Sequence, residues 1–314
     1  MSDAPAQQKA APATHSTTLP TPAAPVLRTE FLLLAVAVTS VAFSAPLIAA
    51  TAAPPLAIAF WRNAMAVAAL TPAALLRHRT ELRSLGRRPL LLTLAAGALL
   101  AVHFGTWLPS LRMTTVASST ALATTTPIWT ILLLRIGGRR QPALAWAGTV
   151  LAVLGVLILT GVDFAASPRA LAGDALALAA GMTAAGYVLL GAEVRRTVGT
   201  VAYTYLCYAT TAVLLLVLCL TTGSALGGYG GGTWLQLALL TATAQLLGHS
   251  LLNRVVKSVG PSVTSTSLLL ETPGAALIAA LWLGQTPPAA ACPALAVILA
   301  GLALVILAGR RRQG

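Results

Sequence analysis

Apolar residues run through this chain in ten nearly continuous stretches, each about as long as a lipid bilayer is thick. A bilayer core about 30 Å thick needs roughly 20 apolar residues in one helix, and short breaks rich in Gly, Pro or Arg separate the stretches. They lack the alternating polar residues of a membrane β-barrel strand. The pattern predicts transmembrane helices over residues 30–49, 56–76, 89–109, 114–134, 143–162, 173–192, 201–221, 233–252, 260–283 and 289–308.

Composition supports a membrane protein and not a soluble one. Hydrophobic residues make up 57% of the 314 residues and charged residues only 9%, which is more apolar surface than a soluble core of this length can bury. Residues 1–28 are rich in Ala, Pro and Thr and predict a disordered tail without a cleavable signal peptide. We therefore expect an all-α polytopic membrane protein.

Basic residues predict which side of the membrane each break faces. The net charge of +13 does not indicate a nucleic-acid partner, because Lys and Arg lie in the breaks between apolar runs. With a cytoplasmic N-terminus, 17 of the 20 basic residues fall on the inner side, Arg112 and Arg169 on the outer side, and Arg62 inside a span. The positive-inside rule then places both termini in the cytoplasm, including the basic tail 309–314. We expect the chain to cross the cytoplasmic membrane of the cell.

The chain matches itself at an offset of 146 residues. The offset pairs Ser119-Thr120 with Ser265-Thr266, Thr126-Pro127 with Thr272-Pro273, His103 with His249, Gly138 with Gly284, Pro142 with Pro288 and Gly155 with Gly301. Each half holds an odd number of spans, so the second half enters the membrane from the opposite side. We expect two inverted five-helix repeats, over residues 30–162 and 173–308, an architecture common among secondary transporters.

These residues resemble the EamA family of the drug/metabolite transporter superfamily. The likeness covers about residues 30–308 and rests on Phe60-Trp61-Arg62-Asn63, Thr126-Pro127, Glu271-Thr272-Pro273 and the glycines at 155 and 301. It implies ten helices in two inverted repeats. The family often carries Gly-Glu after the fourth and ninth helices, where this chain has Gly138-Arg139 and Gly284-Gln285, so no role of those acids transfers here.

Two charged residues lie well inside predicted spans. Glu271 stands about a dozen residues into its helix, near the midplane, and Arg62 lies roughly 10 Å from the outer end of its own. A charge that faces lipid is costly, so each is a candidate for substrate binding or proton coupling. The alternatives are a structural ion pair or hydrogen-bonded acid for Glu271 and snorkelling to the outer headgroups for Arg62.

Weaker site candidates are polar or aromatic. His103 and His249 are paired by the repeat and can relay protons, or fasten helices by hydrogen bonds. Trp107 lies near an outer interface, where membrane anchoring competes with cavity lining. Tyr208 is the offset partner of Arg62, which makes it a cavity candidate.

Two prolines mark candidate hinges. Pro127 and Pro273 interrupt backbone hydrogen bonding in the fourth and ninth predicted helices. A local opening there is compatible with a neighbouring cavity, and a simple bend is equally compatible.

A secondary transporter is the leading functional hypothesis. It would move a small metabolite, amino acid-like or otherwise small and polar or amphipathic, by alternating access, in the export direction and with proton coupling through Glu271. We expect a monomer or homodimer with no cofactor and no metal, because no phosphate-binding loop and no third metal ligand is visible. An intramembrane enzyme and a channel-like facilitator are the alternatives, although neither a nucleophile arrangement nor a filter motif is apparent.

Overall fold

Helices account for the regular structure throughout the described part of the chain. The computed structural model describes residues 24–248, 251, 255 and 270–310, and no strand occurs among these residues. The helices are α1 Ala24–Ala42, α2 Ser44–Ala50, α3 Pro55–Arg77, α4 Arg79–Arg83, α5 Arg87–Ser110, α6 Val116–Ala123, α7 Thr126–Ile136, α8 Ala143–Ala166, α9 Pro168–Val194, α10 Thr200–Thr221, α11 Gly231–Leu240, the π-helical η1 Thr241–Gly248, α14 Glu271–Leu283 and α15 Ala291–Arg310.

Seven helical segments of the described residues are long and apolar enough to cross a membrane. They are Thr29–Ala50, Pro55–Arg77, Arg87–Ser110, Val116–Ile136, Pro168–Val194, Thr200–Thr221 and Ala291–Ala308. Shorter apolar stretches occupy Ala143–Leu159 and Glu271–Leu283, and α11 continues directly into η1. The chain is thus a multi-pass helical protein. Residues 260–269, most of the first half of the predicted ninth helix, lie outside the described residues.

Several predicted helices differ from those observed. Helix α1 begins at Ala24, inside the segment expected to be a disordered tail, and the helix expected over 30–49 is divided at Phe43 into α1 and α2. The segment expected as one helix over 114–134 is divided into α6 and α7, and Pro127 lies in the first turn of α7, where its missing N–H is harmless. The segment expected from residue 173 begins at Pro168 instead. The Ser167 side chain accepts a hydrogen bond from the Ala170 N–H and so caps α9, which leaves only one residue between α8 and α9.

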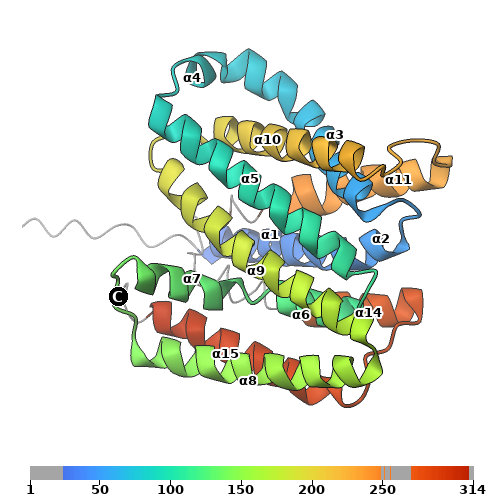
Figure 1. Ribbon diagram of the computed structural model, residues 1–314. Coiled ribbons are helices and arrows are strands. Elements are labelled where there is room, and N and C mark those ends of the chain that lie inside the picture. The colour runs from blue at the N-terminus through green and yellow to red at the C-terminus, as the bar shows by residue number, and fades with distance from the viewer. Residues whose placement is uncertain (1–23, 249–250, 252–254, 256–269, 311–314) are drawn as a thin grey trace, which may run out of the picture.

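The helices pack in pairs that lie side by side in Figure 1. Helix α8 packs on α15, α3 on α10, α5 on α9, α6 on α14, and α1 on η1. The α8–α15 pair is held at backbone contact by glycines, since a Cβ at Gly148 would lie 2.6 Å from the Gly301 carbonyl oxygen and one at Gly155 would lie 2.8 Å from the Ile298 nitrogen. Small residues permit this close approach of membrane helices.

Gly181 and Ala185 also serve packing within the chain. Both are buried in α9, and a Cβ at Gly181 would lie 2.9 Å from Thr125 Oγ1, beside the break between α6 and α7. This small-residue pattern therefore brings α9 against that break.

Charged turns gather at one end of the bundle. The turns after α3, α7 and α9 and the C-terminal end of α15 lie together on the left of Figure 1. They carry Arg77, Arg79, Arg83, Arg87, Arg88, Arg135, Arg139, Arg140, Arg195, Arg196 and Arg310. The opposite end has Arg112 and Arg169, so the two ends of the bundle differ strongly in charge.

Candidate functional site

A buried arginine forms the centre of the candidate site. Arg62 lies in α3, two turns from its start, and is only 1% exposed. Its Nε and Nη2 donate hydrogen bonds of 3.1 and 2.5 Å to Oε1 of Gln245, which lies in η1. The guanidinium is therefore held inside the helical bundle and does not snorkel to the outer surface, and its direct partner is a neutral amide.

Aromatic rings from α5 form one wall beside Arg62. The guanidinium carbon lies 4.4 Å from the Phe104 ring centroid, a cation–π distance. The ring of His103 lies between Phe104 and Trp107, with centroid distances of 5.0 and 5.8 Å. Trp107 is 6% exposed, so its side chain is part of the interior and does not anchor the protein at a lipid interface.

His103 is fastened to a neighbouring helix. Its Nδ1 lies 2.9 Å from the Ala180 carbonyl oxygen in α9, and because a carbonyl only accepts, Nδ1 carries the proton. The hydrogen bond orients the ring and supports the interpretation of His103 as an interhelical contact. Its predicted repeat partner, His249, lies outside the described residues.

Tyr208 and Glu271 approach the same arginine from the second half of the chain. Tyr208 is buried in α10 and interacts electrostatically with Arg62. Glu271 begins α14 and is partly buried. It also interacts electrostatically with Arg62, but among the described residues no cation lies within 4 Å of its carboxylate. The two charges are neighbours without forming a direct ion pair.

Of the predicted site residues, four come together around Arg62. Trp107, His103, Tyr208 and Glu271 surround it from three helices, α5, α10 and α14. The candidate hinge Pro273 lies in the first turn of α14. Pro127 lies beside the α6–α7 break, close to where the Thr124 and Thr272 hydroxyls meet at 3.2 Å.

Sequence reasoning missed two buried polar residues. Gln245 is 1% exposed and is the direct partner of Arg62, yet an isolated glutamine in an apolar run carries no distinctive signal. Its place in the π-helical η1 is the one structural hint, because such turns are frequent at functional sites. Asp174 is fully buried in α9. The Ser167-Pro168 pair is a helix-start signal in the sequence, and a helix that begins there has Asp174 about 9 Å inside it.

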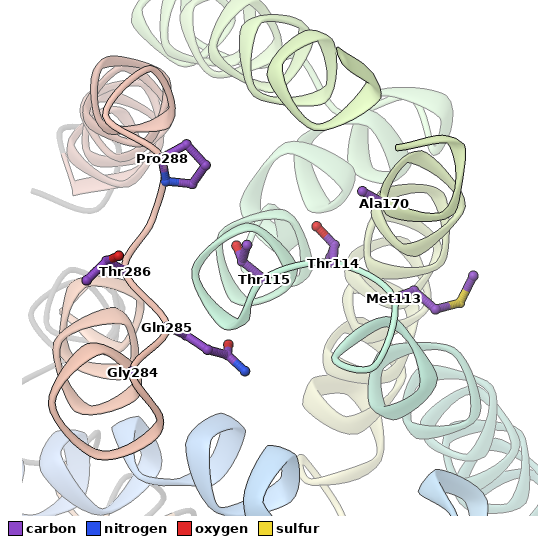
Figure 2. A pocket seen from close by; sticks show the side chains of 8 residues that line it. All are labelled: Met113, Thr114, Thr115, Ala170, Gly284, Gln285, Thr286 and Pro288. Carbon is purple, nitrogen blue, oxygen red and sulfur yellow. The ribbon is translucent and has the colours of Figure 1, made fainter. Parts of the chain in front are cut away.

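A separate hollow of about 380 Å³ opens at the sparsely charged end of the bundle. Its lining comes from Met113, Thr114, Thr115, Ala170, Gly284, Gln285, Thr286 and Pro288. Figure 2 shows Gln285 extending from the α14–α15 turn toward the start of α6, where its Oε1 accepts a long hydrogen bond of 3.5 Å from the Val116 N–H. The lining is uncharged, and it joins turns from the two halves of the chain.

Within the described ranges, no three His, Cys, Asp or Glu side chains lie close enough together to bind a metal ion.

Comparisons with known proteins identify the family. Residues 28–161 and residues 171–307 each match the EamA-like transporter family, whereas no curated protein matches the chain. One solved structure, described only as a crystal structure of a protein, aligns with a TM-score of 0.62 at 20% sequence identity, over 90% of this chain and 99% of the other; this likeness shows the fold alone. Because the two family matches together span most of its length, the chain belongs to the EamA-like transporter family, whose members are membrane transporters of the drug/metabolite type.

Proposed function

We propose that this protein is a secondary transporter that moves a small metabolite across the cytoplasmic membrane by alternating access, in the export direction. The observation that carries the proposal is the buried cluster around Arg62, which combines residues of both family repeats. Arg62, Phe104 and Trp107 come from the first matched repeat, and Tyr208, Gln245 and Glu271 from the second. A site at the junction of two repeats changes its access when one repeat moves against the other.

Contacts between helices support ten spans in two inverted repeats. At the 146-residue offset, α3 corresponds to α10 and α8 to α15, and the helices of each of these two pairs are in contact. The α5–α9 contact has its counterpart in the contact between α1 and η1. Gly138 and Gly284, also equivalent, both have positive φ angles of 81° and 66°. An approximate two-fold axis in the membrane plane generates this pattern.

The charge difference between the two ends supports an inside location for both termini. The end with the arginine-rich turns is the cytoplasmic one under the positive-inside rule. The uncharged hollow beside Gln285 then faces the outside. Pro127 and Pro273 lie in the first turns of α7 and α14, near the contact between the repeats, where a change in the angle at which either helix begins would alter access to the site.

Glu271 is the residue that we propose for proton coupling. It is a carboxyl group within the apolar bundle, close to Arg62 but without a direct ion pair to a described residue. Such a group can take up a proton when the site faces one side and release it when the site faces the other. The chain has no phosphate-binding loop for ATP, so an ion gradient or the solute gradient supplies the energy.

Flux measurements test the proposal. Purified protein in liposomes, with an imposed pH gradient, is presented with labelled amino acids, nucleosides and cationic dyes. We expect flux of at least one solute, acceleration by the pH gradient, and loss of that acceleration in Glu271→Gln. Glu193→Gln is the matched control, because Glu193 is exposed at the end of α9, where it pairs with Arg196 at 3.2 Å.

Two results would contradict the proposal in different ways. Absence of flux for every class of solute argues against transport. Flux whose pH dependence is the same in wild type and Glu271→Gln removes the coupling role from Glu271 and leaves transport intact.

A further inference from the structure

We propose that Arg62 binds an anionic group of the solute, and that Gln245 positions Arg62 for this task, so the substrate class is small carboxylates. This inference rests on the proposed transport function and names its substrate class. It follows from how the guanidinium is partnered, covered and oriented.

Among the described residues, no direct partner balances the charge of Arg62. Arginine stays protonated in proteins, and burial of an unpaired cation in a membrane helix is costly. Both side-chain hydrogen bonds of Arg62 go to one amide oxygen of Gln245, which carries no charge. Glu271, which interacts electrostatically with Arg62, does not come within ion-pair distance of it. Among the described residues the guanidinium therefore has no directly bound counter-charge, and an anionic solute would supply one.

Two hydrogen-bond donors beside the aromatic wall lack an acceptor in the described part of the chain. Arg62 Nη1 and Trp107 Nε1 are both buried, and neither finds a hydrogen-bond acceptor within the described part of the chain. Buried polar groups are nearly always hydrogen-bonded, so each of these two donors indicates a place for an acceptor, and Arg62 and Trp107 both border the rings of Phe104 and His103. A carboxylate has two acceptor oxygens and suits the edge of a guanidinium.

One edge of the Arg62 guanidinium is left for a ligand to bind. The Phe104 ring covers one face of the guanidinium at 4.4 Å, and Gln245 occupies the edge formed by Nε and Nη2. The edge at Nη1 remains. The rings of Phe104 and Trp107 beside it suit an apolar or aromatic body on the solute.

The neutral side chain of Gln245 leaves the positive charge of Arg62 available to a solute. An acid at this position would accept the same two hydrogen bonds and also neutralise Arg62, and so compete with the solute. A glutamine orients the guanidinium and leaves its charge unpaired. Gln245 is thus a positioning residue, and Gln245→Glu is the substitution that separates orientation from charge.

Binding of three matched probes tests the proposal. The probes are phenylpropanoate, its amide and phenylpropylamine, which share a skeleton and differ in charge. Stabilisation of the purified protein against heating is measured for each probe at millimolar concentrations, together with flux in liposomes. Wild type should bind the acid about tenfold or more tightly than the amide or the amine, as expected of a charge-assisted hydrogen bond.

Variants locate that preference at Arg62. Arg62→Gln and Gln245→Glu should each weaken binding of the acid about tenfold or more, and Arg62→Lys should retain part of it. Arg77→Gln, at the exposed last turn of the same helix, is the control and should bind as wild type. Monodisperse elution of each variant and its melting temperature without probe establish that it is folded. If Arg62→Gln does not fold, Arg62→Lys and Gln245→Glu, which keep a charged group at the site, still test the proposal.

The outcomes distinguish the anion site from transport. Equal binding of acid and amide, preference for the amine, no binding of the acid by wild type, or undiminished acid binding in Gln245→Glu would overturn the anion assignment. Flux of other solutes in the same liposomes would then leave the transport proposal standing. Arg62-dependent binding of the acid without any flux would support the anion site and contradict transport.

Discussion

The hydrogen bonds between Arg62 and Gln245 predict a large energetic coupling between α3 and η1. Gln245→Leu removes the shared acceptor and leaves the guanidinium buried at 1% exposure with no direct acceptor among the described residues. A hydrogen bond to a charged group contributes about 1.5–3 kcal/mol, and breaking a buried polar pair from one side costs about 3–5 kcal/mol. Because both hydrogen bonds share one acceptor oxygen, we expect Gln245→Leu to lower the free energy of unfolding by about 3 kcal/mol.

A double-mutant cycle isolates this coupling. Arg62→Met alone removes the charge, and Arg62→Met with Gln245→Leu replaces both partners by apolar side chains of similar size, which is often nearly neutral. The loss in the double variant should therefore be smaller than the sum of the single losses by about 2–3 kcal/mol. Reversible unfolding in lipid bicelles, followed by circular dichroism at increasing denaturant, gives the four free energies of unfolding.

Additivity would refute this reasoning. If the four free energies combine to a coupling below about 0.5 kcal/mol, the two side chains do not stabilise one another, and the geometry of the site as described is wrong. Flux is not the readout in this cycle, because both residues belong to the proposed binding site.

Two glycine substitutions test the packing of the repeats. Gly301→Ala should lower the free energy of unfolding by about 1–3 kcal/mol, because the new Cβ would lie 2.7 Å from the Gly148 carbonyl oxygen. Gly105→Ala is the control and should be neutral or stabilising, because the nearest atom there is a Leu218 methyl at 3.6 Å. Equal effects of the two substitutions in an unfolding titration would contradict the α8–α15 contact. Gly138→Ala should lower the melting temperature, because a residue with a side chain at φ of 81° is destabilised by about 1–2 kcal/mol. Gly137→Ala, one residue earlier with φ of −70°, should not lower it. A Gly138→Ala protein as stable as wild type would show that the turn after α7 tolerates a side chain.

The presence of membrane helices was predictable from residue type alone. In lipid, a segment must satisfy its own backbone hydrogen bonds and present apolar side chains, so long runs of Ala, Leu and Val are sufficient to identify spans. The same sequence contained the signals for two further features. The Ser167-Pro168 pair marks the start of α9, and Pro127 marks the start of α7. The family likeness seen in the motifs around Arg62 and Glu271 was confirmed by matches over residues 28–161 and 171–307.

Which polar residues meet was decided only by the tertiary structure. A membrane helix that is apolar on all sides has no periodicity that reveals its inward face, so the hydropathy of η1 could not distinguish Gln245 from other residues in its run. Trp107 was compatible with an interface position until the packing of α5 placed it in the interior. Residue type and run length thus determined that the chain crosses the membrane. Helix packing determined that Arg62 meets Gln245, 183 residues away along the chain. Contacts between helices depend on the rotation and depth of each helix in the membrane, which its apolar composition does not encode.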